Sequence, residues 1–134
     1  MSLIIAPFAN AVDRLREGLR RYELDTTDEQ IRDGLIQRFE FTYELSHKML
    51  KRYLEQTAAS PESLDQMPFQ DLVRTGREQG LLRSGWPEWR RYREMRSRTS
   101  HAYDAKIALE VVAAIPDFLE EAAFLRAELE RRLG

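Results

Sequence analysis

The 134-residue sequence contains no cysteine, which excludes disulfide bonds and thiolate chemistry. Its two histidines, His47 and His101, are 54 positions apart and belong to no zinc-binding pattern such as HExxH. The six glycines are scattered and form no phosphate-binding loop. Paired acids of the kind that hold Mg²⁺ for nucleotidyl transfer are also missing. We therefore expect neither a metal nor a cofactor.

Long apolar runs are lacking as well. No stretch approaches the roughly 20 apolar residues that a membrane-spanning helix needs, and the first fifteen residues lack the basic lead-in and apolar region of a signal peptide. Ordinary apolar and charged fractions of 43% and 33% argue against wholesale disorder. The sequence thus predicts a single domain over residues 1–134, with no membrane segment and a cytoplasmic location.

No segment alternates apolar and polar residues with a period of two, so no sheet is expected. Apolar residues instead recur every three or four positions over most of the chain. These stretches predict four substantial helices and one short one, at about residues 6–23, 28–58, 69–80 and 87–98, and from 104 almost to residue 134. The predicted architecture is an all-α, up-and-down four-helix bundle with one additional short helix.

Residues that favour helix starts refine this prediction. Thr26 with Glu29, or Thr27 with Gln30, has the spacing of a capping box at the start of the second helix. Asp104 is a good N-cap for the last helix, because a carboxylate accepts from free backbone N–H groups and suits the positive end of the helix.

Charge is unevenly distributed around the net value of −2. Residues 74–98 hold eight arginines against three glutamates, a local balance of +5, whereas residues 104–134 hold seven acids against four bases. A charge run of this kind fits a solvated helix face and an anion-binding patch equally well.

The segment from Trp86 to Asp104 lies within and beside this basic block. Arg96 belongs to the last turn of one predicted helix and His101 to the connection that follows, so both side chains can project into one groove. A guanidinium can clamp a phosphate and offset transition-state charge, and a histidine can move a proton near neutral pH. These are the parts of metal-free RNA cleavage, in which a ribose 2′-hydroxyl attacks the adjacent phosphate.

Plainer interpretations remain open beside this one. The same two residues can simply bind an anion, or Arg96 can pair with Glu94 or an acid of the last helix while His101 caps a helix. His47, near the edge of an apolar stripe, is expected to be a partly buried structural residue. Trp86 and Trp89 have helical spacing and are expected in the core, although tryptophans can also stack bases.

Phe41 and Leu45 lie one turn apart and outside the apolar stripe of the second predicted helix. Exposed singly, such residues would have no significance. Together they suggest a contact between subunits.

Several motifs in fixed order resemble the nucleotidyltransferase substrate-binding proteins, a branch of the HEPN domains. They are RFEFTYELSHKMLKRYLE (38–55), SP (60–61), GLL (80–82), W-x5-M (89–95) and RSRTSHAYD (96–104). The likeness spans about residues 38–125, most of the chain, and the number of ordered matches makes it fairly specific.

The resemblance implies a four- or five-helix bundle that forms a homodimer and accompanies a separate minimal nucleotidyltransferase. It also implies the activity of related toxins from toxin–antitoxin pairs, which are metal-independent RNases with an R-x4-H-x-Y motif in a groove across the dimer. The motif maps onto Arg96, His101 and Tyr103. In such pairs the partner enzyme can silence the toxin by transferring AMP to the motif tyrosine, here Tyr103.

The expected site thus has Arg96 and His101 in catalysis, with Tyr103, Ser97 and Arg98 in substrate binding or modification. Two positions depart from the family pattern. Ser97 replaces the usual asparagine and has less reach and fewer donors, which bears on cleavage rather than on fold. His47 replaces a common aromatic residue, which agrees with a packing role.

Three functional hypotheses follow from these residues. The first is an RNase toxin that acts on RNA. The second is a non-catalytic subunit that binds a nucleotide or substrate for the nucleotidyltransferase. The third is a purely structural dimer, which requires Arg96 and His101 to be buried and engaged with acids of their own chain.

Overall fold

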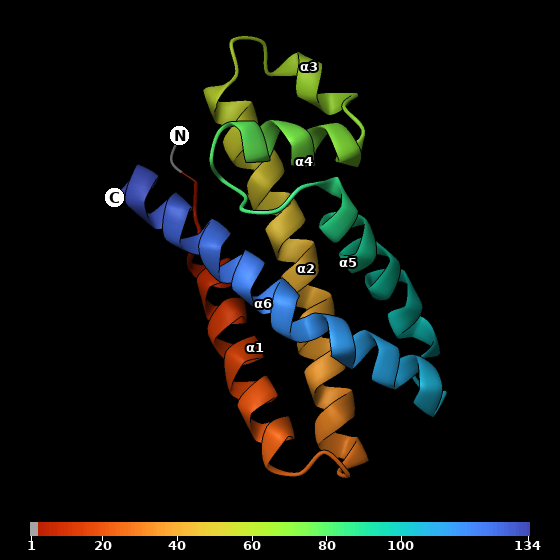
Figure 1. Ribbon diagram of the computed structural model, residues 1–134. Helices are drawn as coiled ribbons and strands as arrows, with labels where there is room; N and C mark the ends of the chain where they lie inside the picture. Colours follow the sequence, from red (N-terminus) through yellow and green to blue (C-terminus); the bar gives the residue numbers. More distant parts are fainter. Residues whose placement is uncertain (1–2) are drawn as a thin grey trace.

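The computed structural model describes residues 3–134, which contain helices and no strand (Figure 1). The helices are α1 (Ala6–Leu24), α2 (Glu29–Thr57), α3 (Glu62–Asp65), α4 (Phe69–Glu78), α5 (Trp86–Arg98) and α6 (Ala105–Leu133), with a single 3-10 turn, η1 (Thr99–His101). The predicted all-α class and bundle architecture are confirmed. None of the described helices is long and apolar enough to cross a membrane.

The long helices surround one core. α1 and α2 form an antiparallel hairpin, α6 crosses in front of both and contacts both, and α5 packs beside α6 (Figure 1). The short helices α3 and α4 cover the end of α2 that precedes them. This arrangement places η1 and the start of α6 at a corner of the bundle, next to α2.

An aromatic cluster joins α5 to α2 and α6. Trp89, Phe39 and Phe118 are each 0% exposed, and the rings of Phe39 and Phe118 meet edge-on with centroids 5.1 Å apart. Trp89 lies 6.1 Å from Phe118 and 6.2 Å from Tyr43. Because edge-to-face packing of this kind fixes ring orientation as well as burying area, the cluster sets the position of α5 and of the residues at its end. Trp89 is a core residue, as predicted.

The start of α2 differs from the prediction. No capping box forms at Thr26 or Thr27; instead Asp28 is the N-cap, and its carboxylate accepts from the backbone N–H of Ile31 at 3.0 Å. The Thr27 hydroxyl donates to Asp25 in the preceding turn. Asp28 offers a charged acceptor one residue closer to the helix, and a carboxylate also interacts favourably with the helix dipole.

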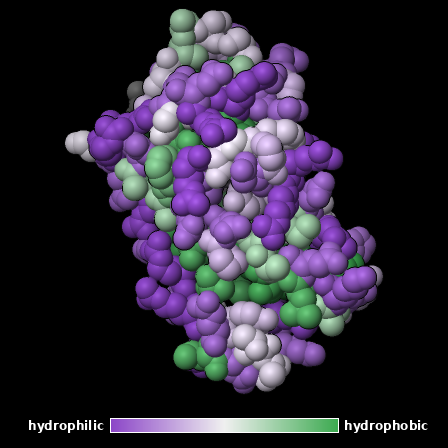
Figure 2. Space-filling view, in the orientation of Figure 1, coloured by the Kyte–Doolittle hydropathy of each residue, from purple (hydrophilic) through white to green (hydrophobic). Residues whose placement is uncertain are grey.

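Figure 2 shows that hydrophilic residues cover most of the face seen in Figure 1, interrupted by a hydrophobic band over the first half of α6. Leu109 of α6 is 52% exposed.

Candidate functional site

The five residues predicted for the site lie on two consecutive elements and in the turn that follows them. Arg96, Ser97 and Arg98 form the last turn of α5, His101 ends η1, and Tyr103 directly precedes the N-cap of α6. The bulk of α5 and α6 is held by the core, so these residues occupy a short, well-anchored junction. Asp104 caps α6 as predicted, with its carboxylate accepting from the N–H of Lys106 at 2.9 Å.

Arg96 faces α2. Its side chain is 28% exposed; Nη2 donates to the carboxylate of Glu44 and lies 4.0 Å from Oε1 of Glu40. Nη1 donates to the hydroxyl of Thr99 at 3.3 Å, whereas Nε is buried and has no hydrogen-bond partner among the described residues. The guanidinium is therefore held in place, with one donor still unused.

The expected partners of Arg96 in the plainer interpretation were wrong. Glu94 lies 3.6 Å from Arg90, on the exposed side of α5. The acids of α6 pair with other arginines, for example Glu110 with Arg98. Arg96 points towards α2 because its position on α5 places it over that helix and not over α6.

His101 and Tyr103 are exposed and adjacent. Their ring centroids are 6.2 Å apart with an interplanar angle of 63°, and Tyr103 is 86% exposed. Within residues 3–134 no hydrogen bond or ion pair engages the imidazole, so the prediction that His101 caps a helix is wrong; Asp104 takes that role for α6. The third hypothesis requires both residues to be engaged with acids of their own chain. Arg96 meets this requirement, but His101 does not.

Ser97 and Arg98 point in other directions. The hydroxyl of Ser97 donates to the carbonyl of Glu94 in its own helix at 2.8 Å, and Arg98 donates to Glu110 of α6. Neither side chain contacts His101 in these bonds. The Ser97 hydroxyl thus forms its hydrogen bond within its own helix, as serine hydroxyls commonly do.

Tyr103 borders a surface hollow of about 340 Å³ between α2 and η1, with Asp33, Gln37 and Glu40 on the α2 side. Arg96 and His101 do not line it. The hollow is acidic and repels phosphate. This hollow is therefore unsuited to binding a phosphate.

Burial raises the pKa of Tyr43 to about 12, and burial together with nearby acids raises the pKa of Tyr92 to about 12. Both phenols stay protonated at neutral pH. Tyr103 is the tyrosine presented most fully to solvent, and so the most accessible to chemical modification.

His47 has the structural role expected of it. It is partly buried, its ring lies 4.2 Å from that of Phe69, and burial lowers its pKa, with Lys51 and Arg93 adding to the effect. Of the predicted subunit-contact pair, Phe41 is 36% exposed, but Leu45 packs partly buried against the core. The placement of Leu45 outside the apolar stripe was wrong, because part of its side chain packs against the core.

The basic block is largely neutralised by acids. Six of its eight arginines pair with a carboxylate: Arg74 with Asp71, Arg83 with Glu120, Arg90 with Glu94, Arg91 with Asp117, Arg96 with Glu44 and Arg98 with Glu110. Only Arg77 and Arg93 pair with no acid among the described residues. The local charge balance read from the sequence therefore overstates the positive surface.

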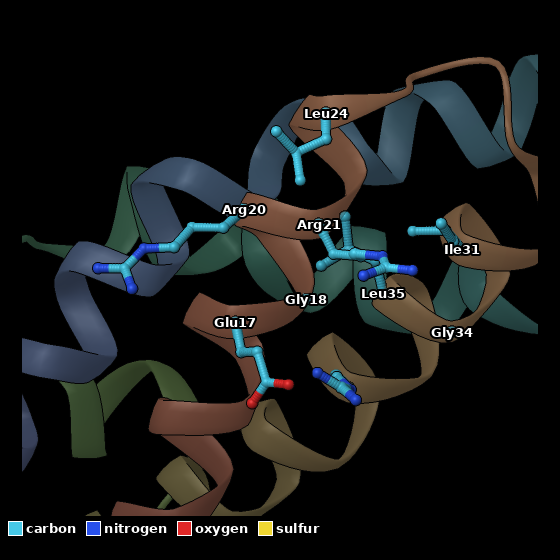
Figure 3. Close-up of a pocket in the computed structure, with 9 residues that line it drawn as sticks. Glu17, Gly18, Arg20, Arg21, Leu24, Ile31, Gly34 and Leu35 are labelled. Carbon is cyan, nitrogen blue, oxygen red and sulfur yellow. The ribbon is translucent and has the colours of Figure 1, made fainter.

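A larger cavity, of about 470 Å³, lies at the hairpin end between α1 and α2 (Figure 3). Arg21 reaches across it towards α2 beside Leu35, whereas Arg20 points away. Gly34 leaves the space open, since a Cβ there would meet nothing within 4 Å. Sequence reasoning did not find this cavity; the only signal was the pair of glycines on facing helices. No group of three His, Asp or Glu residues in the described chain is placed to hold a metal ion.

Comparison with known proteins gives a consistent result. Residues 3–131 match the family model described as nucleotidyltransferase substrate binding protein like. The chain is 44% identical over 99 residues to a Haemophilus influenzae protein named "Probable ribonuclease HepT", with 74% of this chain and 67% of that protein covered.

Solved structures extend the likeness to the fold. One, also from Haemophilus influenzae, is described as revealing the fold of a substrate binding domain of a nucleotidyltransferase. It is 34% identical, has a TM-score of 0.88, and covers 95% of this chain and 99% of its own. A Thermus thermophilus protein is 30% identical with a TM-score of 0.72, covering 91% of this chain and 98% of its own.

Proposed function

The chain belongs to the nucleotidyltransferase substrate binding protein like family, and from this membership we propose that it is a metal-independent RNase toxin. Its antitoxin is a separate minimal nucleotidyltransferase. The observation that carries the proposal is the exposed His101–Tyr103 pair, with ring centroids 6.2 Å apart, placed one turn after the partly buried Arg96. The Haemophilus relative named a ribonuclease supports it.

The proposed reaction is cleavage by transphosphorylation. The ribose 2′-hydroxyl attacks the neighbouring phosphorus, the bond to the 5′-oxygen breaks, and the products are a 2′,3′-cyclic phosphate and a free 5′-hydroxyl. His101 takes the 2′-proton or supplies one to the leaving oxygen, and its exposed, unpaired ring is free to do either. No metal and no other reactant enters this balance.

Arg96 is the proposed phosphate contact. Its side chain is 28% exposed, and a phosphate oxygen can accept from the Nη groups, since Nε is buried. Glu44 is 59% exposed and holds Nη2 through an accessible ion pair, which a phosphate can replace at little cost because exposed pairs contribute about 0–1 kcal/mol. Glu40 and Glu44 thus orient the guanidinium in the free protein, and the substrate phosphate replaces them when it binds.

We propose that two copies of the chain together complete the groove. In one copy, Tyr103 faces an acidic hollow, and Arg96 and His101 do not share it. A second copy would supply the facing wall, with Phe41, which is 36% exposed, among its contacts. In this dimer Tyr103 contacts substrate. Its exposed phenol is also the proposed acceptor of AMP from the nucleotidyltransferase, which would block the groove and silence cleavage.

The decisive experiment compares RNA cleavage by the wild type, His101→Ala and His47→Phe in the presence of EDTA. We expect the wild type to leave a cyclic phosphate and His101→Ala to lose about 100-fold or more of the rate. His47→Phe changes the only other histidine and should cut at the wild-type rate. Equal activity in the wild type and His101→Ala would remove the basis of the proposal.

A second candidate is a non-catalytic nucleotide-binding subunit of the nucleotidyltransferase. It is favoured by the Haemophilus structure described as a substrate binding domain, and by Ser97, whose hydroxyl is already engaged with Glu94. Calorimetry with ATP, with and without the nucleotidyltransferase, tests it. Binding that weakens in Arg96→Ala, without any RNA cleavage, would select this function over the first.

A further inference from the structure

Trp86, at the start of α5, is only partly buried, unlike Trp89, which is 0% exposed. One edge of its ring packs against Phe69, with centroids 6.0 Å apart at 74°. The rest of the ring borders two surface hollows at once. One, of about 360 Å³, lies towards α4, and the other, of about 270 Å³, runs along α5. Trp86 thus packs against the core with part of its side chain, and the part that stays exposed lies between two hollows.

Both hollows are lined by arginines. Arg74 and Arg77 line the one towards α4, and Arg90 and Arg93 line the one along α5. Arg77 and Arg93 are the two arginines of the basic block that pair with no acid of the described chain. Arg90 has only an exposed partner in its own helix, at 3.6 Å. Within the basic block, the two arginines left without an acid therefore lie one on each side of Trp86. Glu78 also lines the first hollow, and Glu94, the partner of Arg90, lines the second.

Gly85 makes room for this arrangement. A Cβ at that position would lie 2.7 Å from Nη1 of Arg77, so glycine lets the guanidinium approach the backbone beside Trp86 without having to shift. The approach places a positive charge next to the residue that precedes Trp86.

The second hollow runs along α5 and ends at Ser97, the residue after Arg96. Trp86, Arg90, Arg93 and Ser97 all line it, and their spacing of four, three and four residues places them in one stripe of α5. The stripe is about 16 Å long at 1.5 Å per residue and ends beside Arg96. A chain lying along it would reach the junction that carries His101.

We propose that Trp86 and the flanking arginines Arg77, Arg90 and Arg93 form a track that binds single-stranded RNA and guides it to Arg96 and His101. Arginines in such tracks contact phosphates, and an exposed aromatic ring stacks on an unpaired base. A duplex keeps its bases stacked inside and cannot offer one to Trp86. An acidic protein would satisfy the arginines but would not use the indole face between them. The proposal that the track guides RNA to Arg96 and His101 rests on the proposed function. The proposal that the track binds RNA does not rest on it.

The first test is binding of a 2′-O-methyl oligonucleotide of about 12 residues, which cannot be cut, measured by fluorescence anisotropy. We expect Trp86→Ala to bind about tenfold more weakly and Trp86→Phe, which keeps a stacking ring, to bind nearly as well as the wild type. Because Trp89 is buried, RNA should quench the emission of Trp86, and Trp86→Phe should lose that quenching while still binding. Unchanged affinity in Trp86→Ala, together with no quenching in the wild type, would overturn the track.

The second test uses the salt dependence of binding. Arg77→Gln/Arg93→Gln removes two phosphate contacts, so the slope of log K against log salt should fall in magnitude by about 1.4. The matched control, Arg14→Gln/Arg20→Gln, removes two exposed arginines of α1 and should keep the wild-type slope. If the first double variant keeps its RNA affinity but loses the nucleotidyltransferase, the surface is a protein-docking site and the proposal is wrong.

Cleavage assays separate the track from the proposed function. If wild type cuts RNA, track variants should cut a long single strand more slowly but a dinucleotide at the wild-type rate, because a dinucleotide does not reach Trp86. If the track variants cut both substrates at the wild-type rate, the track is rejected and the ribonuclease proposal stands. RNA binding through the track by a wild-type protein that cuts nothing would support the track and reject the ribonuclease.

Discussion

At the scale of single residues, Glu121 has the most demanding environment in the described chain. It is 0% exposed; Oε1 accepts from Nε1 of Trp89 at 2.9 Å and from the backbone N–H of Ser84 at 3.3 Å. Oε2 lies 3.6 Å from Nε of Arg83 and has no hydrogen bond. One carboxylate of α6 therefore fixes both the start of α5 and the turn before it.

We predict that Glu121→Ala lowers the free energy of unfolding by about 3 kcal/mol, because it leaves the indole N–H of Trp89 and the charge of Arg83 without their buried partner. Glu120→Ala is the matched control. It removes the other acid that pairs with Arg83, but Glu120 is 63% exposed, so the loss should stay within about 0.5 kcal/mol. Urea denaturation of both variants measures the difference. Equal losses would show that Glu121 is not the anchor described here.

His47 predicts a pH dependence of stability. Burial lowers its pKa in the folded chain, so the unfolded chain binds the proton more readily. The contribution to stability is therefore complete above the unfolded value of about 6.5 and is lost as pH falls through the folded pKa. Denaturation at about pH 7.5 and pH 5 should show a smaller decrease for His47→Phe than for wild type. The same decrease in both proteins would contradict this.

The candidate site shows what a sequence can reveal about individual residues. Arg96, His101 and Tyr103 could be found because they are close in sequence and form a motif. Glu44, the ion-pair partner of Arg96, lies 52 positions away, and no local pattern indicates it. Nor could the sequence show that Arg77 and Arg93 are left unpaired, because that depends on which acids the fold brings to the other six arginines.

At the scale of helices, the long elements were predictable to within one or two residues. Their apolar residues recur at the helical period, and Asp104 marks a start that the structure retains. α3 and η1 were missed because four and three residues respectively are too few to show a period. The start of α2 was misassigned since Thr26, Thr27 and Asp28 all suit an N-cap, and only the backbone decides among them.

Two glycines should respond oppositely to alanine. At Gly34, inside α2, a Cβ would meet nothing within 4 Å, so Gly34→Ala should raise the free energy of unfolding by about 0.5–1 kcal/mol through helix propensity. Gly80 follows α4 with φ of +77°, and a Cβ there would lie 3.2 Å from Nη2 of Arg132. Gly80→Ala should therefore cost about 1–2 kcal/mol. Thermal denaturation of the two variants tests this prediction. Melting temperatures that shift in the same direction would contradict it.

At the scale of the whole molecule, most arginines of the basic block form ion pairs with acids of the same chain. Arginines of α5 and the turn before it pair with acids of α6, as in Arg91 with Asp117 at 3.5 Å. Such exposed pairs add little stability, about 0–1 kcal/mol each, and the buried aromatic cluster holds the two helices together. The pairs instead decide which part of the surface remains positive.

We predict that the protein is a dimer at micromolar concentration, since one copy leaves the proposed groove open and Phe41 exposed. Light scattering should give about twice the mass of the chain, which is 15.8 kDa, and Phe41→Asp should shift the mass towards the monomer. Leu109→Asp, which alters the hydrophobic band on α6, is the comparison. A monomeric wild type would contradict the dimer, and dissociation by Leu109→Asp alone would move the interface to α6.

The position of α6 also has a consequence for synthesis on the ribosome. α6 contacts α1, α2 and α5, and Arg126 ties it to the carbonyl of Ala9, 117 positions earlier. Until this helix emerges, α1 packs on α2 alone and the core stays open on the side that α6 later covers, so the nascent chain remains accessible to proteases and chaperones. The chain therefore completes its core, and with it the setting of the candidate site, only once α6 has been made.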